Sequence, residues 1–172
     1  MPAPKAAPLV RRMSQLASPL QVRPFCLTDA AAVEPWLTGP GLSLPGGAAR
    51  TNWPQRLLAD SHILAQVAEC GGRQVGFVRL DCGPDRIAEI TLVVAPEARR
   101  RGLGRALFLA ALAQARRRWL WRLVAVVDLG NQPALTFFQE LGFAPDGLLG
   151  DRLRLSRLVH AGDHQRPLVI DV

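Results

Sequence analysis

The sequence predicts a single α/β domain in which a mixed, mostly antiparallel sheet is flanked by helices. Three strand-like runs follow one another in mid-chain, which favours antiparallel pairing, and a strand–helix–strand unit between Ile87 and Val127 requires parallel neighbours. A length of 172 residues suits one domain, and a hydrophobic fraction of 49% is enough for a full core. We expect a flexible leader over residues 1–19, the folded domain over 20–159 and a tail over 160–172.

Apolar periodicity, together with turn and cap signals, predicts the individual elements. In chain order they are strands at 20–26, 62–70, 74–81, 86–94, 121–128 and 151–159, and helices at 27–37, 53–60, 101–120 and 131–143. Glycine and proline mark residues 38–50 as a loop, and Gly-Gly-Arg at 71–73 favours a hairpin. Thr28 or Asp29 is the expected cap of the first helix and Asn131 that of the last. Strict alternation predicts that 151–159 is an edge strand.

The charge of the chain is carried by arginine, since Lys5 is the only lysine among the residues that give a net charge of +7. An arginine- and alanine-rich composition is also what a GC-rich genome produces, and no nucleic-acid-binding motif is visible, so we do not expect a nucleic-acid partner.

Cysteine usage and hydropathy indicate the cellular compartment in which the protein is expected. Cys26, Cys70 and Cys82 form no C-x-x-C pair, which argues against a disulfide framework and a zinc site and favours a reducing, cytoplasmic setting. Absence of an apolar run of about 18 residues predicts no membrane helix, and no signal-peptide core is present. The lack of acidic residues before Asp29 is compatible with an organellar transit peptide.

Arginines and glycines gather in the stretch EARRRGLGRAL, residues 97–107, between a predicted strand and a predicted helix. Unpaired backbone N–H groups at a helix N-terminus bind phosphate oxygens, and glycine lets a ligand approach the backbone. A Walker A loop needs a lysine that is missing here, and the dinucleotide fingerprint needs a glycine where Leu107 stands. The pattern present is R-x-x-G-x-G, from Arg99 to Gly104.

With a second motif, this pattern resembles the GCN5-related N-acetyltransferase (GNAT) family. LVVAPEARRRGLGRAL looks like the acetyl-coenzyme A (acetyl-CoA) pyrophosphate motif, and NQPALTFFQELGF is similar to N-x-x-A-x-x-F-Y-x-x-x-G-F. QVGFVRLD resembles the third strand of the family, and the likeness covers roughly residues 22–157. It implies a GNAT-like fold and an N-acetyltransferase that uses acetyl-CoA as cosubstrate, needs no metal, and moves the acetyl group directly to a primary amine in a ternary complex.

The same resemblance implies which residues hold the cosubstrate. Backbone groups of residues 92–94 would bind the pantetheine arm as an added strand does, and the backbone of 100–105 would bind the pyrophosphate. Asn131 would hydrogen-bond the arm near the thioester, which is compatible with its role as a plain helix cap. The implied cosubstrate-binding residues are Leu92, Val93, Val94, Arg99, Arg100, Arg101, Gly102, Leu103, Gly104, Arg105, Asn131 and Phe138.

For catalysis, Glu89 resembles the general base that some members carry on this strand, although a solvent-facing strand glutamate is the alternative interpretation. Asp128 and Asp81, at strand ends, are weaker candidates. Phe138 stands where the family usually has a tyrosine acid, and the chain contains no tyrosine.

Three interpretations of the replacement of the usual tyrosine by Phe138 remain open. Water or the departing ammonium protonates the thiolate, another donor such as Cys82 or Ser61 replaces the tyrosine, or the protein binds acyl-CoA with little catalysis.

The acceptor pocket in such folds is built largely by the first helices and their loop. Trp36, Arg50 and Trp53 are therefore candidate acceptor-binding residues, with core packing as the alternative for both tryptophans. We expect a small-molecule amine, such as an amino sugar or an amino acid derivative, and no membrane partner. A protein N-terminal acetyltransferase and a non-catalytic acyl-CoA sensor are the alternatives. The sequence does not fix the oligomeric state, and a homodimer is compatible with it.

Overall fold

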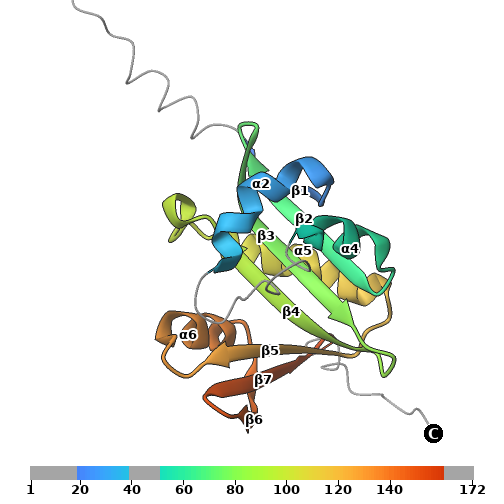
Figure 1. Cartoon of the computed structure of the whole chain (residues 1–172). Coiled ribbons are helices and arrows are strands. Elements are labelled where there is room, and N and C mark those ends of the chain that lie inside the picture. The colour runs from blue at the N-terminus through green and yellow to red at the C-terminus, as the bar shows by residue number, and fades with distance from the viewer. Residues whose placement is uncertain (1–18, 39–50, 161–172) are drawn as a thin grey trace, which may run out of the picture.

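A computed structural model describes residues 19–38 and 51–160, and within them seven strands form one open sheet in the order β1-β2-β3-β4-β5-β7-β6 (Figure 1). The strands are β1 (Gln21–Pro24), β2 (Ile63–Cys70), β3 (Arg73–Cys82), β4 (Ile87–Val94), β5 (Arg122–Asp128), β6 (Ala144–Leu149) and β7 (Arg152–Leu158). The helices are η1 (Leu27–Asp29), α2 (Ala30–Val33), η2 (Glu34–Thr38), α4 (Trp53–Ala59), η3 (Pro96–Ala98), α5 (Leu103–Arg117) and α6 (Gln132–Glu140). Nearly all of the predicted leader, the predicted tail and the predicted loop lie outside the described residues.

The pairing of the strands confirms the predicted fold class. β4 and β5 are parallel neighbours, as the strand–helix–strand unit requires, and the other neighbouring strands pair antiparallel. Gly71 and Gly72, both at positive φ, make the turn of the predicted hairpin between β2 and β3. Positive φ is costly for other residues, so these glycines permit the tight turn.

Helices cover both faces of the sheet, and each face has its own apolar cluster. α5 and α6 lie on one face, where Phe108, Leu123 and Leu155 are buried in the larger cluster. The short helices η1, α2, η2 and α4 lie on the other face, where Phe25 and Phe77 belong to the smaller cluster (Figure 1). None of the helices in residues 19–38 and 51–160 is long and apolar enough to cross a membrane.

The edge of the sheet differs from the prediction. β7 is not an edge strand, because it pairs with β5 on one side and with β6 on the other. β6 was not predicted, since Pro145 and Gly147 interrupt it, its residues are all exposed, and its register shifts between these two residues. Proline, a bulge and exposure are typical of an edge strand, and they remove the alternation by which a strand is detected.

Asp29 anchors the short helices to the sheet. Its buried carboxylate accepts two hydrogen bonds of 2.8 Å from the Arg23 guanidinium, one of 3.0 Å from Gln74, and one of 2.9 Å from the backbone N–H of Cys26. Hydrogen bonding to Arg23 holds the pKa of the Asp29 carboxyl well below its usual range, against the opposing effect of burial. The helical segment begins with η1 at Leu27, after Cys26, and Asp29 stands at the N-cap position of α2, as one of the two predicted candidates, although its side chain makes no capping hydrogen bond to α2.

Candidate active site

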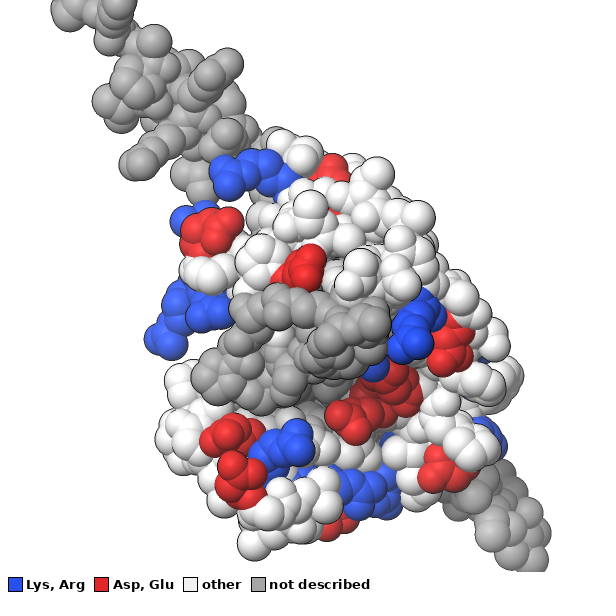
Figure 2. All heavy atoms as spheres, in the orientation of Figure 1, with Lys and Arg blue, Asp and Glu red and all other residues white. Residues whose placement is uncertain are grey.

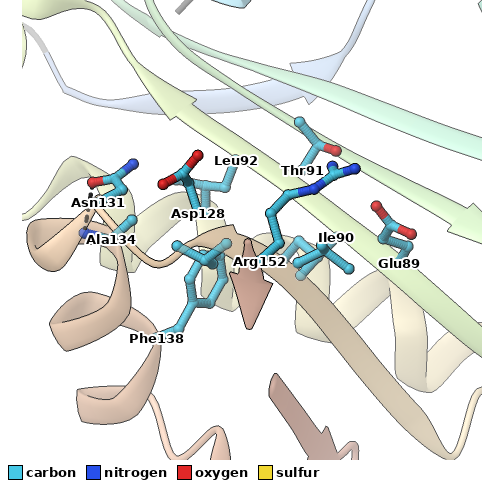
Figure 3. Close-up of a pocket in the computed structure, with 11 residues that line it drawn as sticks. Glu89, Ile90, Thr91, Leu92, Asp128, Asn131, Ala134, Phe138 and Arg152 are labelled. Atoms are coloured by element: carbon cyan, nitrogen blue, oxygen red, sulfur yellow. Dashed lines mark hydrogen bonds between the residues drawn. The ribbon is translucent and has the colours of Figure 1, made fainter. Parts of the chain in front are cut away.

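A cavity opens where β4 and β5 part. The two strands pair at Ile87–Glu89 and Arg122–Val124 and diverge beyond these residues, as Figure 1 shows on the side of α6. The cavity between the diverging ends is lined by Glu89, Ile90, Thr91, Leu92, Val126, Val127, Asp128, Asn131, Ala134, Phe138 and Arg152 (Figure 3). It therefore brings together the predicted base and three of the implied cosubstrate-binding residues, Leu92, Asn131 and Phe138.

One edge of β4 has no partner at this place among the described strands. β4 stays paired with β3 as far as Val94, opposite Gly76, but its pairing with β5 ends at Glu89. Alternate N–H and C=O groups of residues 90–94 therefore face the cleft without a strand partner. Such an edge can accept an extended polar chain by backbone hydrogen bonding.

The loop after β4 turns sharply before α5 begins. Arg100 has φ 63° and Gly102 has φ 78°, both left-handed, and α5 starts at Leu103. The N–H of Ala106 donates to the carbonyl of Gly102 at 3.2 Å, so the N–H groups of residues 103–105 precede the first intrahelical bond. The Nε of Arg99 donates to the carbonyl of Val94 at 3.2 Å and ties the loop to the end of β4. This N-terminus belongs to a helix of 15 residues, α5, and not to a short helical turn.

Gly104 lets the first turn of α5 lie against α6. A Cβ at this position would stand 3.0 Å and 3.1 Å from two ring atoms of Phe137 and 3.7 Å from Val94. Because the two contacts with Phe137 are tighter than ordinary van der Waals contact, a larger residue would push Phe137 away. The glycine therefore has a packing role as well as its implied role beside a ligand.

Asn131 caps α6, as predicted. Its Oδ1 accepts from the N–H of Ala134 at 3.2 Å, shown as the dashed line in Figure 3. The same side chain lines the cavity, and no bond from its amide nitrogen to another described residue is present. The cap and a contact with a ligand are thus geometrically compatible.

Three charged side chains line the cavity on the face that the short helices cover. Glu89 lies on the same side of β4 as Val93, which packs in the smaller apolar cluster. Asp128 and Arg152 face each other in the register of β5 and β7, and their neighbours Val127 and Leu153 contact the opposite, larger cluster. Glu89 therefore shares one face with an aspartate and an arginine, while Leu92 points to the other.

Arg152 is the charged residue of the cavity lining that the sequence did not indicate as a site residue. The alternation of residues 152–158 already separated Arg152 from Leu153 and Leu155, so its face could be inferred, but its proximity to Glu89 could not. The weaker candidate Asp128 also lines the cavity, where its carboxylate accepts from the N–H of Gly130 at 2.8 Å. Asp81 does not line it and is bonded by Arg79 at 2.7 Å and 2.8 Å.

Phe138 closes the inner end of the cavity. Its ring is 7% exposed and lies edge-on to Phe137 and Phe143, with ring centroids 5.4 Å and 5.1 Å away. Neither Cys82 nor Ser61 is among the lining residues. Cys82 packs against the larger cluster, and burial raises the pKa of its thiol. Neither residue is therefore placed to replace the missing tyrosine.

The candidate acceptor residues lie elsewhere. Trp53 is 6% exposed and packs against Phe25 at 5.6 Å, and Trp36 contacts the same smaller cluster. Arg50 lies outside the described residues. Neither tryptophan lines the cavity, and an acceptor-binding role for these three residues stays a prediction.

The order of the strands, the parted β4 and β5 and the loop before α5 agree with the GNAT-like fold that the motifs imply. The model of the acetyltransferase (GNAT) family matches residues 30–143, which is more than half of the chain. The chain belongs to the acetyltransferase (GNAT) family.

Relatives agree with this assignment. The chain is 42% identical to a mycothiol acetyltransferase of Thermomonospora curvata over 78 residues, which cover 45% of this chain and 26% of the relative. It thus spans about a quarter of the length of that curated relative.

Solved structures show the same fold. Spermidine N-acetyltransferase of Vibrio cholerae, in complex with CoA and spermine, matches with a TM-score of 0.69 at 20% identity, covering 84% of this chain and 96% of that one. PaiA N-acetyltransferase of Thermoplasma acidophilum, in complex with coenzyme A, matches with a TM-score of 0.69 at 16% identity over 81% and 99% of the two chains.

Proposed function

We propose that the protein is an acetyl-CoA-dependent N-acetyltransferase that moves an acetyl group directly to a primary amine of a small molecule. The observation that carries this proposal is the parting of β4 and β5 beside the N-terminus of α5. The unpaired edge of β4 leads from the cavity toward the loop at Arg99–Gly102 and the free N–H groups of residues 103–105. A donor with an amide-rich arm and a pyrophosphate fits such a path.

The residues present fit the two ends of acetyl-CoA. Residues 92–94 offer backbone groups to the pantetheine arm, and residues 99–105 offer N–H groups and positive charge to the pyrophosphate. Asn131 has an amide group at the cavity that can bond the arm near the thioester. Phe138 supplies an apolar wall to the acetyl end.

The chemistry then needs few groups from the protein. The lone pair of a neutral amine attacks the thioester carbonyl carbon, the C–N bond forms, and the C–S bond breaks as the thiolate leaves. Holding both substrates in one cleft supplies much of the rate. Glu89 is placed to accept the proton that the amine loses, directly or through water, since its carboxylate makes no bond with another described residue. The thiolate takes its proton from water, or it takes the proton of the ammonium nitrogen in the tetrahedral intermediate in place of Glu89.

One observation favours a second function, the binding of acyl-CoA without rapid transfer. Phe138 occupies the inner end of the cavity and carries no ionisable hydrogen, so the protein lacks the usual acid there. Because a thiolate is a fair leaving group, we expect this loss to slow transfer rather than abolish it.

A thiol-release assay separates the two functions. The protein is incubated with acetyl-CoA and with each of a panel of primary amines, and free thiol and N-acetylated product are measured in parallel. We expect thiol release that depends on the amine and equals the product formed, above the hydrolysis measured without amine. Binding of acetyl-CoA in calorimetry without product from any amine would establish the binding function instead.

A further inference from the structure

Arg152 differs from the other strand arginines on the face that carries Glu89. Arg79 is held by Asp81 through two hydrogen bonds, and Arg154 and Arg122 lie 3.1 Å and 3.7 Å from the carboxylate of Asp146. Arg152 makes no hydrogen bond or ion pair with any described residue. It is also the arginine of this set that lines the cavity.

The position of Arg152 keeps it beside the carboxylates of the cavity without neutralising them. It faces Asp128 in the register of β5 and β7, yet the Asp128 carboxylate is bonded by the N–H of Gly130. Figure 3 shows the Arg152 side chain extending from β7 over β5 toward the side of β4 that carries Thr91 and Glu89. A guanidinium offers a planar fork that fits a carboxylate with two parallel hydrogen bonds. Such a fork in a substrate cavity, with no partner among the described residues, is suited to an anionic group of the substrate.

We propose that the acceptor is an amine that also bears a carboxylate, and that Arg152 determines this specificity by binding the carboxylate. This inference rests on the proposed acetyltransferase function. The amine of the same acceptor lies toward Glu89 and Asp128, so that a zwitterion meets opposite charges at both of its ends. Figure 2 shows that acidic and basic side chains are intermingled on the face that the short helices cover.

The charges of the cavity favour this acceptor over two others. A polyamine would place one of its ammonium groups against Arg152. A phosphate monoester carries up to two negative charges, and Glu89 and Asp128 would both repel it. A carboxylate carries a single charge and matches the fork of one arginine.

The test compares matched acceptors and matched variants. The acceptors are α-, β- and γ-amino acids, the carboxamide of each, 2-aminoethyl phosphate and 1,4-diaminobutane, with kcat/KM measured for each. We expect the wild type to prefer the best amino acid over its carboxamide by about 10- to 100-fold. Arg152→Gln should bring this ratio to within about twofold of one, with the change mainly in KM, and Arg152→Lys should restore part of it.

Arg154→Gln is the matched control, because Arg154 lies two residues away on the same face but is paired with Asp146. It should keep the preference of the wild type, and thermal unfolding should show that both variants are folded. A wild type that does not prefer the acid, or that prefers the phosphate or the diamine, overturns the proposal. Equal loss of preference in Arg152→Gln and Arg154→Gln also overturns it.

Binding measurements separate failure of this inference from failure of the proposed function. If no amine is acetylated, calorimetry with CoA present compares the affinity for an N-acetyl amino acid with that for its carboxamide. Tighter binding of the acid that is lost in Arg152→Gln supports the role of Arg152 even then, and equal binding of the two ligands contradicts it.

Discussion

The two walls of the cavity are built by different means. One wall, the backbone wall, consists of the free edge of β4, the loop at residues 99–102 and the first turn of α5, and it offers mainly N–H and C=O groups. The other, the charged wall, consists of the side chains of Glu89, Asp128 and Arg152 on the face covered by the short helices.

This difference separates what the fold shares with its class from what is particular to this chain. Backbone groups can bind a constant part of a ligand whatever the neighbouring side chains are, provided that glycine leaves room for it. Charged side chains can change without altering the sheet, so they are suited to choosing the variable ligand. Substitutions in the backbone wall should therefore affect binding of the donor, and substitutions in the charged wall should affect the acceptor and the chemistry.

The largest effect is expected from Gly104→Glu in the backbone wall. The new side chain would meet Phe137 at its Cβ and bring a negative charge to the N–H groups that bind the pyrophosphate. We expect the affinity for acetyl-CoA, measured by calorimetry, to fall by more than about 100-fold.

Ala113→Glu is the control for this change, because Ala113 is an exposed residue of the same helix and the added charge is the same. It should leave the affinity within about twofold of the wild type. If Gly104→Glu binds acetyl-CoA as well as Ala113→Glu does, the loop before α5 is not the pyrophosphate site.

The division between the backbone wall and the charged wall also explains which site residues could be predicted from sequence. Gly102, Gly104 and Asn131 lie in short contiguous motifs, where a positive φ, a close contact or a helix cap requires a particular residue. The position of Arg152 beside Asp128 depends on the register of β7 against β5, which pairs residues 24 positions apart. Such pairing follows from packing of the whole sheet, so no local pattern indicates it.

The strands and helices show the same contrast between local patterns and long-range pairing. The alternation of β7 was correctly predicted, but its place in the sheet was not, because β6 carries Pro145 and Gly147 and has no buried residue to reveal it. The role of Asp29 at the start of the first helix shows the same limit. Asp29 was expected to cap locally, whereas its carboxylate bonds Arg23 and Gln74 from two different strands.

The second prediction concerns Asp29, which anchors the short helices to the sheet and does not line the cavity. Asp29→Asn removes the charge that pairs with Arg23, and we expect it to lower the free energy of unfolding by about 2 kcal/mol at pH 7. The loss is smaller than for a fully buried pair, because 34% of the Arg23 side chain is exposed and Glu69 still bonds it at 2.9 Å. Urea unfolding measures this difference.

The pH dependence of the same variant has a definite sign. The pKa of Asp29 is lowered on folding, so its contribution is present above the unfolded value of about 3.9 and is lost as the pH falls through and below that value. The difference between wild type and Asp29→Asn should therefore shrink between about pH 5 and pH 3. Asp60→Asn, at an exposed position, should change stability little, and a difference independent of pH would contradict the ion pair.

The third prediction tests the charged wall directly. Glu89→Gln keeps the size of the side chain but removes its ability to accept a proton, so we expect kcat/KM for the amine to fall about 100-fold at neutral pH. The affinity for acetyl-CoA should stay within about twofold.

Glu97→Gln is the control, because Glu97 is exposed and does not line the cavity. Should Glu89→Gln weaken donor binding as much as it lowers the rate, the two walls would not have separate roles. A rate equal to that of the wild type at every pH would remove Glu89 from the mechanism.

The smallest effect is expected where the two walls meet, at Phe138. Phe138→Tyr adds a hydroxyl to a ring that already lines the cavity, and a phenol there can donate a proton to the leaving thiolate. We expect kcat to rise by several-fold, up to about 10-fold, because a thiolate needs less help than a poorer leaving group. Phe137→Tyr, which adds the same hydroxyl to the neighbouring ring outside the cavity lining, should not raise kcat. An increase in both variants, or in neither, would show that a donor at position 138 does not limit the reaction and that water or the departing ammonium already supplies the proton.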